Sequence, residues 1–379
     1  MRIGFDVSHI QVRRAGIGRY SAEMLRTLIA ALREDDIVLH GWSYGIDVPF
    51  LTSLAGGRVS LRIRRIPGSA KRWYWDSCRH PTIDRFTGPI SVFQSCDPFL
   101  PPLGRIQGVC TVHDCCQRRY PRFFGHAIHR RERALEDSLA RAGAVIVPSR
   151  QTRDDVVEMY RIPGERIRVL TPPLSPLFHP PRAEETARDL AVARALAGER
   201  PFVLFVGTIE PRKNVPRLIR AFESAAGALS NDLSLLIAGK PGWMYDDVFR
   251  ALRESPCRDR ITYVDYPSDE QAAALYRTAR LFVYPSLFEG FGYPVFEAMA
   301  SGLPVVTSNT SALAELARGA AELVDPFDVE ALAGAIERLA SDGLRRTELA
   351  AAGLDRARSL AGTDRAQALI DIFGSLVAN

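Results

Sequence analysis

Short apolar runs alternate with longer amphipathic segments along nearly the whole chain of 379 residues. Runs of about four to eight residues rich in Val, Ile, Leu and Phe are typical of strands that are buried on both faces. Between these runs, apolar residues recur at helical spacing, as they do at Tyr20, Met24, Leu25, Leu28 and Ala31. Strands that alternate with helices indicate a parallel sheet covered on both faces, so the predicted fold class is α/β.

The predicted strands form two series separated by a proline-rich segment. The first series contains the runs at 2–8, 37–43, 59–66, 90–95, 108–114 and 144–149. The second series begins with the run at 202–208. Between the two series, TPPLSPLFHPP (171–181) has the composition of an interdomain linker. We therefore predict two Rossmann-like domains, at 1–175 and 176–362.

The stretch PSLFEGFGYPVFE (285–297) places two carboxylates eight positions apart, after one predicted strand and at the start of a helix. Gly290 and Gly292 allow backbone N–H groups to approach a ligand closely, because no Cβ intervenes. The helix directs the positive end of its dipole and its unpaired N–H groups at this turn. Such a turn suits a ligand rich in hydroxyls or phosphates, with Glu289 bonding a sugar and Glu297 reaching a ribose diol. The spacing also fits a capping Glu289 and an ordinary helical Glu297.

Arg212 and Lys213 lie between the strand predicted at 202–208 and the following helix. A bound anion would meet an arginine fork, a lysine charge and a helix N-terminus at this position. Only three of the 49 basic residues are lysines, and Lys240 on a later glycine turn is another of them. A solvated pair of basic residues beside a helix is the competing interpretation.

Further polar or flexible positions also lie at predicted strand ends, where parallel sheets bind their ligands. His113 ends the run at 108–114, where it could contact a ligand or could hydrogen-bond a carbonyl of its own loop. Gly16 begins the first helix, where the backbone could approach a diphosphate. Tyr266 and Pro267 follow another strand and could form the rim of a nucleobase site.

Composition restricts the partners and the cofactors. The first 180 residues hold 27 basic against 17 acidic residues, although the whole chain carries only +5. No nucleic-acid-binding motif accompanies these charges, so we expect no nucleic acid partner. The segment Arg62–Trp75 mixes Arg and Lys with Trp and Tyr, which favours contact with an anionic membrane surface, although a solvated loop fits it as well.

The chain shows no run of 18 apolar residues and no signal-peptide pattern, so the expected location is the cytoplasm, with peripheral attachment to the inner face of the membrane. Its six cysteines form neither a C-x-x-C pair nor a zinc spacing. A D-x-D motif, which could bridge a diphosphate to magnesium, is also missing from the sequence. We therefore expect neither a metal nor another cofactor.

Four motifs together resemble retaining glycosyltransferase family 4, and in particular its bacterial mannosyltransferase-like members. They are GTIEPRKN (207–214), GKPGW (239–243), SDEQAAALY (268–276) and the stretch at 285–306. The resemblance covers nearly the whole chain. It implies the GT-B fold, in which two Rossmann-like domains face a central cleft. The N-terminal domain would bind the acceptor, and residues 363–379 would cross back to pack on it.

The resemblance also implies roles for individual residues. Donor binding would involve residues that follow strands of both domains: Gly16, Arg212, Lys213, Tyr266, Pro267, Glu289, Gly290, Phe291, Gly292 and Glu297. Catalytic roles would belong to Glu289, His113, Lys213 and Arg212. Among these, Arg212 and Lys213 would hold the diphosphate and meet its developing charge without a metal. Glu289 would hold the donor sugar, which His113 would also contact.

The implied reaction transfers a hexosyl group, with mannose from GDP-mannose as the first choice, to a saccharide or a polyprenyl-diphosphate-linked acceptor in cell-surface polysaccharide synthesis. Thr208 and Asp265 stand where relatives often carry Arg and Gly, so a UDP-sugar donor stays open. An epimerase, an inverting transferase and a non-catalytic sugar-nucleotide or glycan-binding protein are competing interpretations. An NAD-dependent dehydrogenase is disfavoured, because Ser21 stands at the third glycine of G-x-G-x-x-G.

Overall fold

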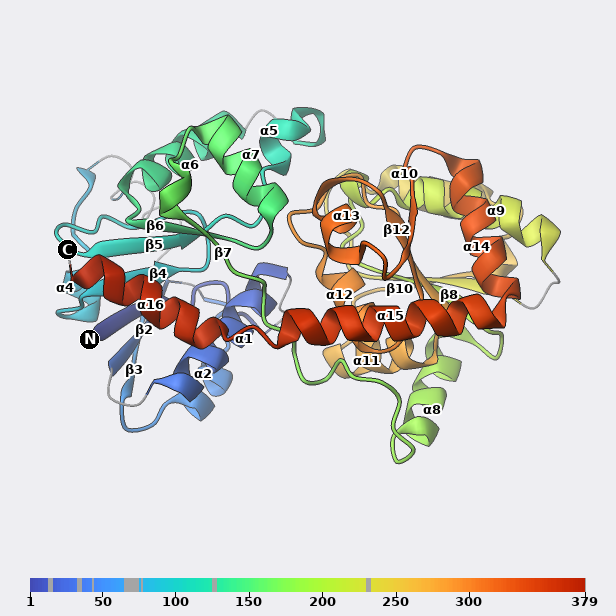
Figure 1. The fold of residues 1–379 in the computed structure, drawn as a ribbon, viewed down its shortest axis with the longest axis horizontal. Coiled ribbons are helices and arrows are strands. Elements are labelled where there is room, and N and C mark those ends of the chain that lie inside the picture. The colour runs from blue at the N-terminus through green and yellow to red at the C-terminus, as the bar shows by residue number, and fades with distance from the viewer. Residues whose placement is uncertain are drawn as a thin grey trace. The chain divides into compact units, whose positions relative to one another are not determined.

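The computed structural model describes residues 1–12, 16–32, 36–42, 44–64, 75, 78–124, 128–229 and 233–378. The chain divides into two compact units, Met1–Pro173 with Thr363–Asn379, and Leu174–Gly362 (Figure 1). Each unit is described by itself below. The first boundary lies between Pro173 and Leu174, whereas the sequence placed it after residue 175.

In its described part, the first unit is built on a parallel sheet of seven strands in the order β3-β2-β1-β4-β5-β6-β7. The strands are β1 (Arg2–Asp6), β2 (Asp36–Trp42), β3 (Val59–Arg64), β4 (Val92–Ser95), β5 (Gln107–Thr111), β6 (Ala144–Val147) and β7 (Ile167–Val169). The α-helices are α1 (Gly16–Ala31), α2 (Val48–Leu54), α4 (Asp84–Thr87), α5 (Cys116–Arg119), α6 (Ile128–Arg141), α7 (Arg150–Tyr160) and α16 (Arg365–Val377). The C-terminal helix α16 packs against α1 and β4, so the end of the chain returns to this unit.

The described part of the second unit contains a parallel sheet of six strands in the order β10-β9-β8-β11-β12-β13. The strands are β8 (Phe202–Val206), β9 (Ser234–Ala238), β10 (Ile261–Val264), β11 (Leu281–Tyr284), β12 (Val305–Ser308) and β13 (Glu322–Val324). The α-helices are α8 (Thr186–Ala197), α9 (Val215–Ala228), α10 (Asp246–Glu254), α11 (Asp269–Thr278), α12 (Tyr293–Ala300), α13 (Ser311–Ala317), α14 (Val329–Ser341) and α15 (Gly343–Ala361). The α/β fold class with two parallel sheets is confirmed.

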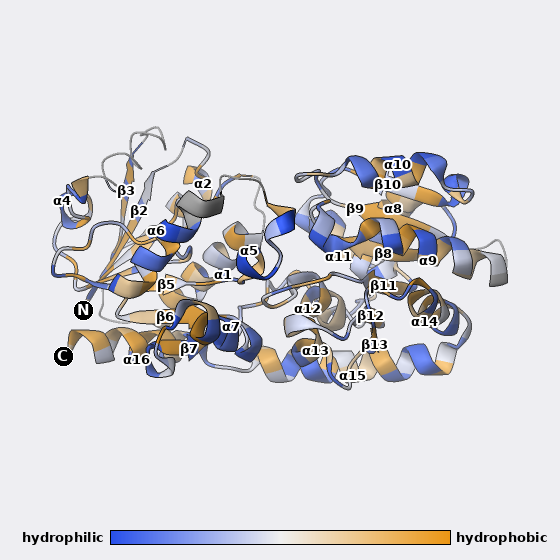
Figure 2. Ribbon diagram, turned by 90° about the horizontal axis from the view of Figure 1, so that it is seen from above, coloured by the Kyte–Doolittle hydropathy of each residue, from blue (hydrophilic) through white to orange (hydrophobic). Residues whose placement is uncertain are grey.

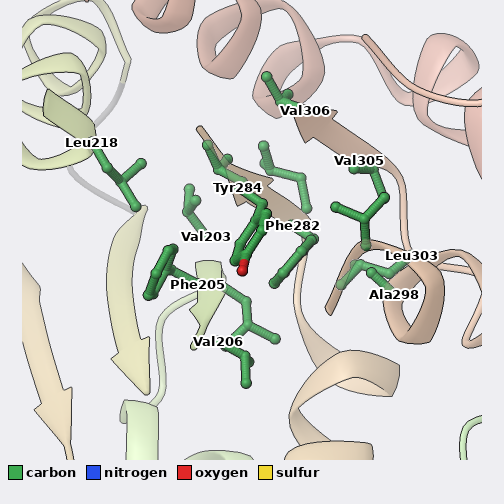
Figure 3. Close-up of a cluster of buried hydrophobic side chains, with 14 of the residues drawn as sticks. Val203, Phe205, Val206, Leu218, Phe282, Tyr284, Ala298, Leu303, Val305 and Val306 are labelled. Carbon is green, nitrogen blue, oxygen red and sulfur yellow. The ribbon is translucent and has the colours of Figure 1, made fainter. Parts of the chain in front are cut away.

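Hydrophobic strands form the centre of each unit. In Figure 2 the strands of the second sheet are largely orange, whereas α15 carries both hydrophobic and hydrophilic residues along its length. Figure 3 shows the core of this sheet, where Phe205, Phe282 and Tyr284 lie close together. The ring centroid of Tyr284 lies 5.6 Å from that of Phe205 and 5.8 Å from that of Phe282, in stacked orientations. Large aromatic rings therefore fix the central strands that lead to the candidate site.

In both sheets the strand order reverses beside the first strand of the unit. β1 lies between β2 and β4, and β8 lies between β9 and β11. Loops leave opposite ways at such a point, and ligands of open α/β sheets bind there, beyond the carboxyl ends of the strands. We therefore expect a ligand-binding site of the second unit at the loops after β8 and β11.

The proline-rich segment 171–181 is only in part a linker. Phe178 is 5% exposed and belongs to the hydrophobic core of the second unit, where its ring packs edge-on against Tyr276 with centroids 5.7 Å apart. Arg277 donates a hydrogen bond to the Leu177 oxygen at 3.0 Å. The composition indicated a free linker because prolines dominate it, but the apolar side chain of Phe178 anchors its second half.

The membrane expectation concerns residues that are mostly not described. Within Arg62–Trp75, only 62–64 and 75 are described, so this prediction lies largely outside the described residues. Across the described ranges of the chain, no helix has both the length and the apolar character needed to span a bilayer.

Candidate active site

The loops after β8 and β11 meet at the point where the strand order of the second sheet reverses. The loop after β8 ends in a single helical turn, Pro211–Lys213, and α9 follows after Asn214. Asn214 adopts a left-handed conformation with φ 62°, which Asn tolerates better than most residues. Its side-chain amide donates to the Pro285 oxygen at 3.0 Å and to the Pro326 oxygen at 2.7 Å. Asn214 thus ties the two loops together.

Backbone contacts reinforce this junction. The Leu287 N–H donates to the Arg212 oxygen at 2.8 Å, and Ser286 Oγ lies 3.1 Å from the same oxygen. On the other side, the Glu289 N–H donates to Ser311 Oγ at 3.1 Å. Ser311 also has a positive φ, 55°, so a strained residue positions the backbone of Glu289.

The carboxylate of Glu289 lies between the two basic side chains that the sequence singled out. Arg212 Nη1 is 2.6 Å from Oε2 of Glu289, and Lys213 Nζ is 2.5 Å from Oε1. Oε1 also accepts hydrogen bonds from the hydroxyls of Tyr284 at 2.9 Å and Ser286 at 2.7 Å. The structure therefore brings Arg212, Lys213 and Glu289 into direct contact with one another.

Electrostatics keep this carboxylate ionised. Burial alone would raise the pKa of Glu289, but the charges of Arg212 and Lys213 and the hydrogen bonds of Lys213 and Ser286 outweigh burial and lower that pKa from 4.5 to about 2. Burial beside this carboxylate raises the pKa of Tyr284 well above its usual value, so the phenol is neutral and donates its proton. At neutral pH, Glu289 is an anion that accepts hydrogen bonds.

Each basic residue has a further partner. Arg212 pairs through Nη2 with Glu210 at 2.7 Å, and Lys213 donates to the Tyr284 hydroxyl at 2.6 Å. Lys213 is 7% exposed and Glu210 is 3% exposed, so the charges are largely removed from water. Two cations and two carboxylates therefore form one buried cluster without net charge.

The glycine-containing turn ends at Gly292, which precedes the first residue of α12. Gly292 has φ 103°, and a Cβ on it would lie 2.5 Å from Leu313 Cδ2, so only glycine fits there. Gly290 and Phe291 are buried within the same turn. The N-terminus of α12 thus begins directly after the turn, as predicted from the sequence.

Glu297 lies in α12 and is 2% exposed. The Tyr276 hydroxyl on α11 donates to its Oε2 at 3.1 Å. The sequence predicted that this carboxylate reaches a ribose, and the described structure places it inside the unit with a tyrosine as one partner. On the neighbouring loop, Tyr266 has φ 44° and Pro267 is buried, so the backbone after β10 makes a tight turn.

His113 and Gly16 belong to the first unit. His113 Nε2 lies 2.7 Å from the Cys96 oxygen, which is a carbonyl contact of the kind that a purely structural histidine makes. Burial lowers the pKa of His113, so the ring is neutral at pH 7 and donates from Nε2 to this carbonyl. Gly16 is exposed, and a Cβ on it would meet nothing within 4 Å, so space does not require glycine there.

Sequence reasoning missed several polar contacts of both units. Tyr284, Ser286 and Tyr276 contact the two glutamates, yet the first two lie inside or beside an apolar strand run that gave no polar signal. In the first unit, His9 Nε2 lies 2.7 Å from Oδ2 of Asp97. Both residues follow strands that are neighbours in the sheet, a signal that only the strand order reveals.

No cluster of three or more His, Cys, Asp or Glu side chains suited to a metal ion is found among the described residues. The expectation of a reaction without a metal therefore remains a prediction. Of the predicted catalytic residues, three form the cluster of the second unit and His113 lies in the first unit.

Comparison with known proteins assigns the chain to a family. A family model described as glycosyl transferases group 1 matches residues 188–356, and one described as glycosyltransferase family 4 matches residues 14–176. The O-antigen chain mannosyltransferase B of Escherichia coli is 30% identical over 371 residues, which cover 94% of this chain and 95% of that protein.

Solved structures share the fold. Sucrose-phosphate synthase from Thermosynechococcus elongatus has a TM-score of 0.78 and 21% identity, with 100% of this chain and 99% of that chain covered. Anabaena HepE in complex with UDP and glucose has a TM-score of 0.75 and 15% identity, with 98% and 99% covered. At these identities, the likeness bears on the fold alone.

Proposed function

The chain belongs to glycosyltransferase family 4, and from this premise we propose that it transfers mannose from GDP-mannose to a saccharide acceptor, with retention of the anomeric configuration. The observation that carries the choice of sugar is the 30% identity to an O-antigen chain mannosyltransferase along almost the full length of both chains. The proposed acceptor is a saccharide carried on a polyprenyl diphosphate during cell-surface polysaccharide synthesis. It would be presented at the cytoplasmic face of the membrane.

The cluster around Glu289 supports a binding role for this carboxylate. It is ionised at neutral pH and can accept hydrogen bonds from the hydroxyls of a hexose, but it has no proton to give as an acid. Arg212 and Lys213 hold it in place and, in this proposal, also face the donor diphosphate. Charge that develops on the departing diphosphate would be stabilised by these cations and by the N-terminus of α9.

The hydrogen bonds of Glu289 favour direct displacement over a covalent intermediate. Oε1 accepts from Lys213, Tyr284 and Ser286, and Oε2 pairs with Arg212. These donors stabilise the negative charge of the carboxylate and so make it a weak nucleophile, while Oε2 can still accept a hydrogen bond from a sugar hydroxyl. In the proposed step, the acceptor hydroxyl attacks the anomeric carbon on the face from which the diphosphate leaves. A departing phosphate oxygen takes the proton of that hydroxyl.

The test is donor hydrolysis followed by analysis of the product. Purified protein with EDTA is incubated with GDP-mannose, UDP-glucose, UDP-N-acetylglucosamine and UDP-galactose, and nucleotide release is measured. We expect release from GDP-mannose alone. Release from a UDP-sugar alone would refute the donor, and dependence on added metal would refute the metal-free step. An α-to-β inversion, seen by NMR in a transfer product, would refute retention.

A further inference from the structure

Lys240 lies on the loop after β9, beside the loop that carries Arg212 and Lys213. The two loops pair in the manner of parallel strands. The Ile209 N–H donates to the Lys240 oxygen at 2.9 Å, and the Gly242 N–H donates to the Ile209 oxygen at 2.9 Å. β8 and β9 are neighbours in the sheet, so Lys240 lies at the same sheet edge as the cluster around Glu289.

The backbone before Lys240 is held closely in place. Gly239 has φ 154°, and a Cβ on it would lie 1.9 Å from the Gly207 oxygen, so the two loops touch with no room for a side chain. The Gly239 N–H donates to the Val264 oxygen at 2.9 Å, and the Tyr263 hydroxyl donates to the Gly239 oxygen at 2.9 Å. The position of Lys240 beside the β8 loop is therefore fixed by contacts from both neighbouring strands.

The cations at this edge differ in whether a carboxylate of the described residues pairs with them. Arg212 and Lys213 are paired with Glu210 and Glu289, and the four charges cancel. Lys240 is half-buried, and its side chain makes no hydrogen bond or ion pair with any residue in the described ranges. A nucleoside diphosphate would bring further negative charge to a cluster whose own charges already balance, so an additional cation beside it would favour binding. The Lys240 ammonium is not among the buried polar atoms that lack a partner, so solvent and an incoming anion can reach it.

We propose that Lys240 binds the diphosphate of the nucleotide-sugar donor. It supplies positive charge in addition to that of Arg212 and Lys213, which are already paired with Glu210 and Glu289. The inference rests on the proposed function, because it takes a nucleoside diphosphate as the ligand. It goes beyond that function by adding Lys240 to Arg212 and Lys213 as a contact of the diphosphate.

The first test measures which part of the nucleotide Lys240 recognises. Isothermal titration calorimetry would follow guanosine, GMP and GDP binding to wild type, Lys240→Ala and Lys240→Arg. The matched control is Arg250→Ala, which removes an exposed cation on α10 that pairs with Asp247. We expect Lys240→Ala to weaken GDP binding by about 10- to 100-fold and to leave guanosine binding unchanged. Lys240→Arg should recover part of the loss, and Arg250→Ala should bind GDP as the wild type does.

Two results of this test would overturn the role of Lys240: unchanged GDP binding, or equal weakening of guanosine and GDP. If wild type binds UDP and not GDP, the proposed donor is wrong, and the same series with uridine, UMP and UDP tests Lys240. The failure of the donor and the failure of Lys240 are thus distinguishable.

The second test needs no nucleoside. The chain has three lysines, so acetylation followed by mass spectrometry assigns each modified site directly. We expect inorganic pyrophosphate to slow acetylation of Lys240 several-fold in the folded wild type. Equal acetylation with and without saturating pyrophosphate would overturn the inference, whatever the identity of the nucleotide.

Discussion

Replacing Glu289 by Gln tests how the buried cluster acts on both stability and activity. The substitution keeps the shape of the side chain and removes its charge. Arg212 and Lys213 then remain buried against a neutral amide, and the ionic part of both contacts is lost. We expect the variant to fold, to lose stability at neutral pH and to transfer sugar at least about 100-fold more slowly, as when a fixed electrostatic contact of a transition state is removed.

The magnitude follows from the pKa of Glu289. Its folded value of about 2 lies below the usual 4.5. Because the folded pKa is depressed, the stabilisation is present above pH 4.5 and is lost as the pH falls toward 2. A difference of about 2.5 pKa units corresponds to about 3 kcal/mol at pH 7. At pH 3.5 the same relation leaves about 2 kcal/mol.

The assay is urea unfolding of wild type and Glu289→Gln at several pH values between 3.5 and 7. Unfolding of the second unit is followed by hydrogen exchange of peptides from residues 281–300, because a chain of two units need not unfold in one step. The stability gap between the two proteins should narrow by about 1 kcal/mol over this range. A gap that stays constant with pH would refute the claim that an ionised Glu289 stabilises the cluster.

Three further substitutions test individual contacts. Tyr276→Phe should fold with a loss of about 1 kcal/mol, because its hydrogen bond to Glu297 disappears, and should raise the donor KM. An unchanged KM would show that Glu297 does not contribute to donor binding. Gly239→Ala should lower the yield of folded protein sharply, since its Cβ would overlap the Gly207 oxygen; a wild-type melting temperature would contradict this geometry. Asn214→Ala should cost about 2 kcal/mol or more in urea unfolding, because two buried carbonyls lose their donor, whereas a cost below about 0.5 kcal/mol would show that water replaces it.

The fold could be predicted well from the sequence, because strands buried in a parallel sheet are recognisable as short apolar runs. The runs at 144–149 and 202–208, for example, correspond to β6 and β8. The shortest strand of the first sheet, β7, was not predicted, because a strand of three residues carries too few apolar positions.

The candidate site could be predicted only as a set of separate pieces. Arg212, Lys213 and Glu289 each carry a local signal, but their mutual contact depends on β8 and β11 being neighbours, which no local pattern encodes. Asn214 shows the same limit, because its two carbonyl partners lie 71 and 112 positions away. Strand order converts such distant residues into neighbours.

The distribution of arginine and lysine supports the special position of the sheet edge after β8 and β9. Arginines often bind pairs of backbone carbonyls: Arg346 contacts the oxygens of Leu339 and Ala340, and Arg356 contacts those of residues 315 and 316. A planar guanidinium suits two acceptors held side by side, whereas an ammonium is a compact charge with three rotatable donors. Two of the three lysines, Lys213 and Lys240, lie on adjacent loops at this edge. One lysine meets a buried carboxylate, and the other has no partner among the described residues. In our proposals, the carboxylate binds the donor sugar and the second lysine binds the diphosphate.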